Sequence, residues 1–427
     1  MLTFSRGVHP ETNKALTADK RIEKMPPPKD LYIPLTQHIG KECVPVVAEG
    51  DYVRMGQLIA RCEEDGVYIH SSVSGTVKGI EQLPTLVAPK SSHIHIENDF
   101  EDNIERLSPL GEDASRESAL QRLKEAGIVG MGGAAFPTHK KLNPPRGEKI
   151  DTFILNGAEC EPYITCDHRL MAERAEEIRR GARLFARILG VERIIVGIEN
   201  NKPDAIEAFK GFSDIEVKVL RAKYPMGAEK QLIYACTGRK VPLGGLPKDV
   251  GCIVDNVHTV YSAYLAVTQG LPCIERLVTV SGGAVENPGN YIIRIGTTYL
   301  HISEHCGLKE QPVKVLGGGP MMGTAAFDLH VAVAKATSSV LFLTEKEINT
   351  EKASPCINCG RCARVCPMYL MPMYIDACTI AGDYKGAKKY GARNCIECGC
   401  CAYVCPAKRP LVQSIRLAKR IVRERNI

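Results

Sequence analysis

The 427-residue sequence contains no tryptophan, and aromatic residues make up only 6% of it. It also lacks any apolar run near the roughly 18 residues that a membrane-spanning helix needs. Its N-terminus has neither the basic start and apolar stretch nor the small-residue cleavage site of a secretory signal. We therefore expect a chain without a membrane span of its own on the cytoplasmic side of a cell, where cysteines seldom form disulfides.

The sequence also has little excess charge. It holds 55 lysine and arginine residues against 49 aspartate and glutamate residues, and residues 407–427, with seven basic residues and one acidic residue, carry the whole net charge of +6. A chain without a broad basic field and with few aromatic residues does not have the pattern of a nucleic-acid-binding protein. Its hydrophobic content of 44% is that of an ordinary globular protein.

The length predicts several domains, and the residue pattern changes along the chain. Short β-type runs broken by glycine predict a small barrel over residues 31–98, after an extended arm over residues 1–30. Alternating helical and strand-like segments predict an α/β layer structure over residues 115–270. Strands return over residues 274–340 and favour a small β-grasp-like domain, and a cysteine-rich domain occupies residues 350–427.

The barrel region carries a recognisable phrase. Val-x-x-Gly-Asp-x-Val-x-x-Gly-Gln-x-Ile, from Val47 to Ile59, resembles the barrel-sandwich hybrid fold of biotinyl and lipoyl carrier domains. Those carriers present a lysine at a hairpin tip, whereas the corresponding stretch here, Cys62–Gly66, contains none. We therefore expect a structural role for this domain and not a carrier role.

Ten of the eighteen cysteines lie between Cys356 and Cys405. They form two copies of C-x2-C-x2-C-x3-C-P, the bacterial-ferredoxin spacing, displaced by 39 residues. In such a pair the fourth cysteine of each motif binds the cluster of the other motif. The spacing predicts two 4Fe-4S clusters, one bound by Cys356, Cys359, Cys362 and Cys405, the other by Cys395, Cys398, Cys401 and Cys366.

Three details of this domain remain. Cys400 aligns with Arg361 of the first motif, so we interpret it as a non-ligand beside a cluster. Eight thiolates would also satisfy two zinc ions, although zinc motifs usually consist of separated C-x2-C pairs. The segments 374–380 and 385–390 look helical, which predicts an α-helical ferredoxin domain.

The α/β region carries a glycine-rich segment and polar strand ends. The segment Gly127–Thr138, followed by Lys141, would let backbone N–H groups approach a phosphate or a flat ring, although a tight structural turn is an equal alternative. An apolar strand at 152–155 ends in polar residues at the edge where α/β proteins bind ligands, and one long amphipathic helix follows over 169–189. The polar candidates after the strands are Asn156, Glu159, Glu161, Tyr224, Glu229, Asp255 and Asn256.

These motifs, in this order, resemble the NADH-binding flavoprotein subunit of respiratory complex I. With the barrel, the small β-grasp-like domain and the ferredoxin pair, nearly the whole chain resembles the C subunits of Rnf ion-translocating ferredoxin:NAD oxidoreductases. The resemblance implies a Rossmann-like flavoprotein core and a soluble-ligand-binding-like β-grasp domain. It implies FMN contacts from Gly130, Gly132, Gly133, Lys141, Asn156, Glu159, Tyr224, Gly227, Glu229, Asp255 and Asn256.

The resemblance also implies a function. Glu161 matches the acid near the nicotinamide of NAD(H), whereas Met131, Ala228 and Lys230 depart from the complex I pattern. The implied protein is a peripheral subunit at the cytoplasmic side of the inner membrane. It would transfer electrons between NAD(H), FMN and two 4Fe-4S clusters, with ferredoxin as a candidate partner, while integral-membrane subunits translocate Na+ or H+.

Two other functions stay open from the sequence. One is a free-standing NADH-dependent flavin/iron-sulfur reductase, such as a cobalamin reductase, and the other is an iron-sulfur relay adaptor without flavin. The basic tail is a predicted amphipathic helix with Leu411, Ile415, Ala418 and Val422 on one face. That face either docks on anionic lipid or an acidic subunit, or it packs on the ferredoxin domain.

Overall fold

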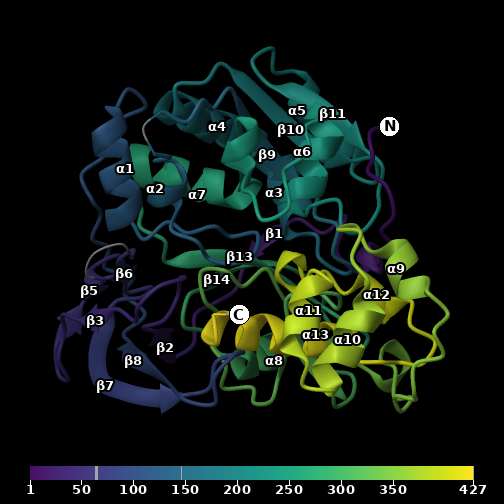
Figure 1. Cartoon of the computed structure of the whole chain (residues 1–427). Coiled ribbons are helices and arrows are strands. Elements are labelled where there is room, and N and C mark those ends of the chain that lie inside the picture. Colours follow the sequence, from purple (N-terminus) through teal and green to yellow (C-terminus); the bar gives the residue numbers. More distant parts are fainter. Residues whose placement is uncertain (63–65, 146, 427) are drawn as a thin grey trace.

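The computed structural model describes residues 1–62, 66–145 and 147–426 and arranges them as four packed bodies (Figure 1). A parallel sheet with helices lies at the top of Figure 1, and a small β structure lies at the lower left. A mixed sheet runs through the middle, and the helical cysteine-rich domain lies at the lower right. This architecture agrees with the predicted multidomain α/β class.

The upper body is built on a four-stranded parallel sheet with the order β11-β10-β9-β12. Its strands are β9 (Thr152–Gly157), β10 (Arg193–Glu199), β11 (Glu216–Leu220) and β12 (Cys252–Asn256). The central strands are apolar runs whose residues, such as Phe153, Ile195 and Val254, are buried. Such runs suit a parallel sheet because helices cover both of its faces.

The helices of this body are α1 (Arg116–Glu125), α2 (Thr138–Lys141), α3 (Cys166–Glu173), α4 (Ala175–Leu189), α5 (Pro203–Lys210), α6 (Glu229–Thr237), η2 (Pro247–Val250) and α7 (Val257–Thr268). The prediction of one helix over 169–189 was wrong. Arg174 leaves the helical conformation, with φ −135° and ψ 33°, and separates α3 from α4. No glycine or proline marks this break, so the sequence pattern continues across it.

The N-terminal β structure consists of two small sheets, β2-β8-β7-β4 and β3-β5-β6. Their strands are β2 (Asp30–Pro34), β3 (Val44–Pro45), β4 (Tyr52–Val53), β5 (Leu58–Arg61), β6 (Ile69–His70), β7 (Gly75–Leu83) and β8 (Ser91–Asn98). Buried residues such as Ile33 and Ile94 share one continuous hydrophobic core with Phe153 and Leu123 of the upper body. Residues 63–65, in the stretch that lacks the carrier lysine, lie outside the described residues.

The middle body is a six-stranded mixed sheet in the order β1-β14-β13-β17-β15-β16. Its elements are β1 (Ile22–Lys24), β13 (Glu275–Ser281), β14 (Gly289–Arg294), β15 (Lys314–Gly317), β16 (Thr324–Ala326), β17 (Ser339–Leu343), helix α8 (Tyr299–Cys306) and turn η3 (Glu345–Glu347). Strand β1 comes from the N-terminal arm and pairs in parallel with β14. The arm is therefore part of this sheet.

The rest of the arm follows the other bodies. Leu2 pairs with Leu220 at the end of β11, and Val8 pairs with Tyr224. The Gly7 N–H donates to the Val365 carbonyl of the cysteine-rich domain at 2.9 Å. A short turn, η1 (Lys14–Leu16), then buries the Lys14 side chain. The arm thus connects the upper body, the middle sheet and the cysteine-rich domain.

The cysteine-rich domain is helical, as predicted. Its elements are α9 (Arg361–Val365), α10 (Pro372–Ile380), α11 (Tyr384–Lys389), η4 (Ala392–Asn394), α12 (Cys400–Tyr403) and α13 (Leu411–Glu424). Helix α13 packs on α10 and α11 and buries Leu411, Ile415, Ala418 and Val422. The apolar face of the basic tail is therefore occupied within the chain, which favours packing over the lipid-bound alternative.

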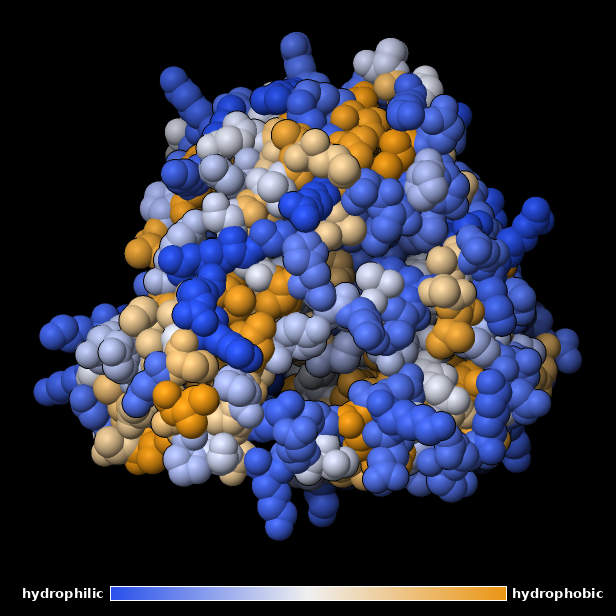
Figure 2. Space-filling model, turned by 90° about the vertical axis from the view of Figure 1, so that its right-hand side faces the viewer, coloured by the Kyte–Doolittle hydropathy of each residue, from blue (hydrophilic) through white to orange (hydrophobic). Residues whose placement is uncertain are grey.

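Within the described residues, no helix combines the length and the apolar character required to cross a bilayer. Figure 2 views the molecule from the side of the N-terminus, α9 and α12. On that face the apolar side chains form separate patches between hydrophilic ones. Isolated patches of this kind are normal for a protein surface.

Candidate functional site

The carboxyl edge of the parallel sheet gathers polar side chains, as the strand pattern predicts. Asn156 at the end of β9 and Asn256 at the end of β12 are direct register partners. Asn156 Nδ2 donates to the Gly227 carbonyl at 2.8 Å, which ties the loop before α6 to the sheet. Asn256 caps α7, since its Oδ1 accepts from the His258 N–H at 2.9 Å. Both amides thereby fix the backbone of the loops at this edge.

The glycine-rich segment between α1 and α2 lies against this edge. Its backbone is held where the Met131 N–H donates to Thr259 Oγ1 at 2.8 Å and the Met131 carbonyl accepts from Arg276 at 2.9 Å. A Cβ on Gly132 would lie only 2.9 Å from Asn256 Cβ, whereas one on Gly133 would meet nothing within 4 Å. Gly133 therefore leaves open space beside its backbone.

Charged side chains lie under this loop. Lys141 Nζ pairs with Glu229 Oε1 at 3.0 Å. Burial lowers the pKa of Lys141, but Asp255 and Glu229 together outweigh burial and leave this pKa raised. Burial raises the pKa of Asp255, and its Oδ2 has no hydrogen-bond partner. Buried carboxylate oxygens normally accept a hydrogen bond. The oxygen of Asp255 that lacks a partner could therefore accept one from a ligand with hydroxyl or N–H groups, and FMN is such a ligand.

Glu159 makes its contacts with the start of α3 and with the N-terminal arm. Its carboxylate accepts from the Asp167 N–H at 2.6 Å and the His168 N–H at 3.3 Å, so it caps the start of α3. Lys14 Nζ lies 3.9 Å from Glu159 Oε2 and donates to the Glu159 carbonyl at 2.9 Å. Burial raises the pKa of Glu159 to about 7, although Lys14 opposes the shift. The structure thus commits this side chain to contacts within the protein.

Glu161 lies on the side of the cysteine-rich domain. Its Oε2 accepts from the Met321 N–H at 3.1 Å, and its Oε1 lies 3.3 Å from the Tyr224 hydroxyl. Gly319 packs so closely that a Cβ there would lie 2.1 Å from Glu161 Oε2. Burial raises the pKa of Glu161 to about 7, despite the hydrogen bond from the Met321 N–H and the nearby Tyr224 hydroxyl. The carboxyl group therefore holds its proton over a much wider pH range than an exposed glutamate.

Tyr224 connects this carboxylate to the cysteine motifs. Its hydroxyl donates to the Cys398 carbonyl at 2.7 Å, and its side chain is buried. The sequence predicted Tyr224 as an FMN contact and Cys398 as a cluster ligand. The structure brings the two residues into direct contact, so the predicted flavin region and the nearer cysteine pocket share one polar bridge.

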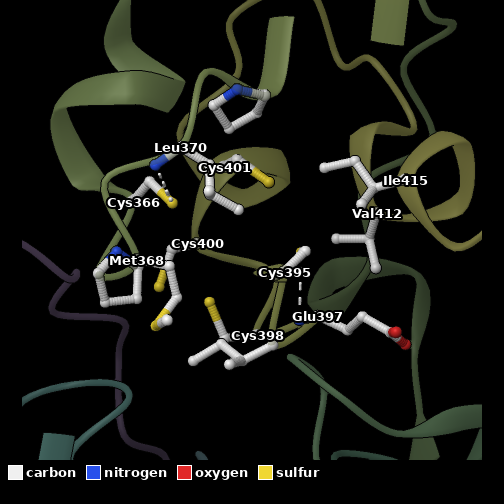
Figure 3. Close-up of a pocket in the computed structure, with 14 residues that line it drawn as sticks. Cys366, Met368, Leu370, Cys395, Glu397, Cys398, Cys400, Cys401, Val412 and Ile415 are labelled. Atoms are coloured by element: carbon white, nitrogen blue, oxygen red, sulfur yellow. Dashed lines mark hydrogen bonds between the residues drawn. The ribbon is translucent and has the colours of Figure 1, made fainter. Parts of the chain in front are cut away.

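The nearer pocket, here called the inner pocket, is shown in Figure 3. Four predicted ligands of one cluster, Cys366, Cys395, Cys398 and Cys401, lie around one space, and Cys400 lines it too. Leu370, Val412 and Ile415 supply an apolar wall. Lys419 donates to the Cys395 carbonyl at 2.9 Å and pairs with Glu397, which places a cation behind this pocket.

The second pocket, here called the outer pocket, is lined by the other four predicted ligands. These are Cys356, Cys359, Cys362 and Cys405. Cys356 and Cys359 are exposed, whereas the inner-pocket cysteines are buried or half-buried. Each pocket combines three cysteines of one motif with the fourth cysteine of the other motif. A soft, thiolate-bound cluster suits such a set of four sulfurs.

Several residues of this region were not predicted from the sequence. Lys14 reaches Glu159 from the arm, and Met321 and Gly319 close over Glu161 from the middle sheet. Nothing near Lys14 in the sequence signals its burial. The run Gly317-Gly-Gly-Pro-Met-Met-Gly323 is a visible signal of a tight loop, and it would have identified the segment that covers Glu161.

Four parts of the chain match known protein families. Residues 2–101 match the RnfC barrel sandwich hybrid domain, and residues 123–265 match the Nuo51 FMN-binding domain. Residues 277–325 match the SLBB domain, and residues 355–408 match the 4Fe-4S dicluster domain. The matches confirm the predicted fold class, with FMN and two 4Fe-4S clusters as cofactors, and they speak against an adaptor without flavin.

Relatives match over nearly the full chain. The sequence is 48% identical to the C subunit of the proton-translocating ferredoxin:NAD(+) oxidoreductase complex of Clostridium ljungdahlii, over 98% of this chain and 93% of that protein. It is 43% identical to the C subunit of the Na(+)-translocating ferredoxin:NAD(+) oxidoreductase complex of Acetobacterium woodii, over 98% and 96%. The chain belongs to this family of C subunits. The C subunit of an ion-translocating oxidoreductase complex of Rhodobacter capsulatus is 46% identical, over 98% of this chain and 83% of that protein.

A solved structure shares the fold of this C-subunit family member. A chain of an NAD+-reducing [NiFe]-hydrogenase in the H2-reduced state superposes with a TM-score of 0.52 at 18% sequence identity. The match covers 72% of this chain and 63% of the hydrogenase chain. The C-subunit fold therefore recurs in a larger chain of a different enzyme.

Proposed function

We propose that this family member exchanges electrons between NAD(H), FMN and two 4Fe-4S clusters as a peripheral part of a ferredoxin:NAD oxidoreductase complex. The relatives from Clostridium and Acetobacterium support this proposal, because their names assign them to proton- and Na+-translocating ferredoxin:NAD complexes. The ions cross the membrane through other subunits. We place the chain at the cytoplasmic side of the inner membrane, where NADH is formed and consumed.

One observation carries the electron path. The Tyr224 hydroxyl contacts both the Cys398 carbonyl, at 2.7 Å, and the Glu161 carboxylate, at 3.3 Å. This contact supports a path in which electrons leave the flavin edge through the inner pocket. Electrons then reach the outer pocket, whose exposed Cys356 and Cys359 suit exchange with a partner protein. The two clusters thus act in series.

The chain's own residues divide the work at the flavin edge. We assign the FMN contacts to the glycine loop (Gly130, Gly132, Gly133) and to Lys141, Asn156, Tyr224, Gly227, Glu229, Asp255 and Asn256. FMN, when bound, supplies the conversion between two-electron and one-electron transfer. Lys141 offers a cation for its phosphate, and the unpaired Asp255 oxygen offers an acceptor. Glu159 supports the site indirectly, through α3 and Lys14.

Glu161 is the residue we assign to proton handling near the nicotinamide. Its pKa of about 7 lets it hold or release a proton at neutral pH. The Met321 N–H and the Tyr224 hydroxyl fix its two oxygens, so a proton on this group is held in one place.

The test is an anaerobic purification of the whole chain, followed by measurement of iron, flavin and reduction by NADH. The proposal predicts about eight iron atoms per chain for two cubane clusters, one FMN, and bleaching of both chromophores by NADH. Full iron without flavin and without bleaching would contradict it. Recovery of the chain alone, free of membrane subunits and active toward cobalamin, would favour the free-standing reductase instead.

A further inference from the structure

A group of residues of the types that bind metals lies in the barrel, far along the chain from both cysteine motifs. His38 lies in the loop after β2, Cys43 directly precedes β3, and Cys62 directly follows β5. Because β3 and β5 are antiparallel, with Val44 opposite Arg61, the flanking cysteines are brought together. One donor atom from each of the three side chains lies within 4.8 Å of the other two.

This group is buried and incompletely satisfied. His38 is 6% exposed, Cys43 2% and Cys62 5%. Neither ring nitrogen of His38 has a hydrogen-bond partner, and burial lowers the pKa of this histidine to about 4. A neutral imidazole with a free lone pair is the form that binds metals. A buried ring without any partner is costly in a protein without a ligand.

The backbone completes the wall around the group. A Cβ on Gly66 would lie 2.1 Å from Cys62 Sγ and 2.3 Å from His38 Nε2, so only glycine fits there. The cysteine thiols have weak partners, since Cys43 Sγ lies 3.4 Å from the Val67 carbonyl and Cys62 Sγ 3.7 Å from the Lys41 carbonyl. Both thiols thus donate to backbone carbonyl oxygens, while one ligand atom from each of the three side chains lies within 4.8 Å of the other two.

A buried cation lies close to this group. Lys335 from the middle sheet donates to the Tyr68 carbonyl at 2.7 Å and the Gly127 carbonyl at 2.8 Å. Burial lowers the pKa of Lys335, although the thiols of Cys273 and Cys43 oppose this shift, and among the described residues no carboxylate lies within ion-pair distance of its ammonium group. Metal binding replaces two neutral thiols by two thiolates and one divalent cation, which together carry no net charge, so it adds no repulsion with Lys335.

We propose that His38, Cys43 and Cys62 form a zinc site, with the fourth tetrahedral position taken by water. Two sulfurs and one imidazole nitrogen are the ligand types that zinc prefers. Binding releases the two thiol protons and forms two Zn–S bonds and one Zn–N bond without any change of oxidation state. This site does not rest on the proposed electron path.

The zinc would stabilise the loops beside the flavin edge. Ile39, next to His38, donates its N–H to the Ala135 carbonyl of the glycine-rich segment at 3.2 Å. Lys335 holds the beginning of the same segment through the Gly127 carbonyl. The metal thus fixes a loop on which the glycine-rich segment rests. Loss of zinc is expected to lower the melting temperature and weaken flavin retention, without removing iron.

Elemental analysis and X-ray absorption test the site on the whole, cluster-loaded chain from cells supplied with Zn2+. We expect about one zinc per chain, with a first shell of two sulfurs near ~2.3 Å and nitrogen or oxygen near ~2.0 Å. The double variant Cys43→Ser/Cys62→Ser loses this zinc and keeps its iron. The matched control Cys306→Ser replaces another buried cysteine and keeps both metals.

Four results would overturn the zinc site, three of which concern the metal. These three are wild-type protein without zinc, zinc whose first shell contains only sulfur, and zinc that persists unchanged in the double variant. A Cys43–Cys62 disulfide in the freshly isolated protein, detected by mass after alkylation, would do so as well. The X-ray absorption measurement requires only wild-type protein, so the test stands even where the double variant fails to fold.

Discussion

The two cysteine pockets come from the same motif but have different surroundings. The inner pocket is buried against the upper body, where Tyr224 contacts the Cys398 carbonyl and Lys419 contacts the Cys395 carbonyl. The outer pocket has two exposed cysteines, Cys356 and Cys359. Identical spacing therefore predicts the same type of cluster, whereas position in the fold sets what each cluster exchanges electrons with.

The largest effect is expected from a variant that interrupts electron transfer from the flavin through the inner cluster to the outer cluster. Cys398→Ala removes an inner ligand, and we expect it to lose about half of the roughly eight iron atoms and to abolish NADH-driven reduction of the remaining cluster. Flavin reduction by NADH continues, because the flavin edge does not need the cluster. Iron analysis and anaerobic absorption spectra measure both effects.

The matched control for that change is Cys359→Ala in the outer pocket. It is expected to lose the same share of iron while NADH still reduces the inner cluster. Equal behaviour of the two variants toward NADH would show that the pockets act in parallel and would contradict the series.

The second prediction concerns Glu161, which lies with Tyr224 beside the inner pocket. Glu161 has a pKa of about 7 in the fold against an ordinary value of 4.5, so it keeps its proton where the unfolded chain has lost it. As the pH rises from about 4.5 to about 7, the protein loses about 3 kcal/mol of stability through this group. Melting temperatures across this range measure the loss.

The Glu161→Gln variant carries an amide that does not titrate in this pH range. It therefore serves as the control for the loss of stability through Glu161. The stability difference between wild type and this variant is expected to change steadily over the same pH range. A difference independent of pH would contradict the assigned burial of the carboxyl group.

A smaller effect concerns the charge behind the inner pocket. Lys419→Gln removes a cation next to the Cys395 carbonyl. Because a nearby cation stabilises the additional electron of the reduced cluster, its removal disfavours reduction. We expect the reduction potential of the inner cluster to fall and that of the outer cluster to stay unchanged in an anaerobic redox titration followed by EPR.

Arg420→Gln on the same helix is the control for Lys419, because Arg420 is exposed and pairs only weakly with Glu424 at 3.9 Å. It is expected to leave both potentials unchanged. A shift of the outer potential alone in Lys419→Gln would reverse our assignment of the pockets.

The smallest effect is expected at Cys400. This residue lines the inner pocket but aligns with Arg361 of the first motif, so we assign no metal to it. Cys400→Ala is expected to keep its full iron content and an unchanged EPR spectrum. Loss of iron would show that a fifth cysteine takes part in binding.

The sequence predicts this molecule best where the functional residues are close along the chain. Cluster ligands follow fixed spacings, and polar residues such as Asn156 and Asp255 lie at the ends of apolar strands, so both groups were predicted. Lys14 and the loop at Gly319 reach Glu159 and Glu161 through tertiary packing, which leaves no local pattern. The break at Arg174 was missed because apolar spacing continues across it.

The order of the two clusters is tested most directly by freeze-quench EPR of the wild-type chain mixed anaerobically with NADH. The single-cluster variants Cys398→Ala and Cys359→Ala assign the two signals beforehand. Our account predicts that the inner-cluster signal rises first and that the outer-cluster signal follows it. Reduction of the outer cluster before the inner one would contradict the account.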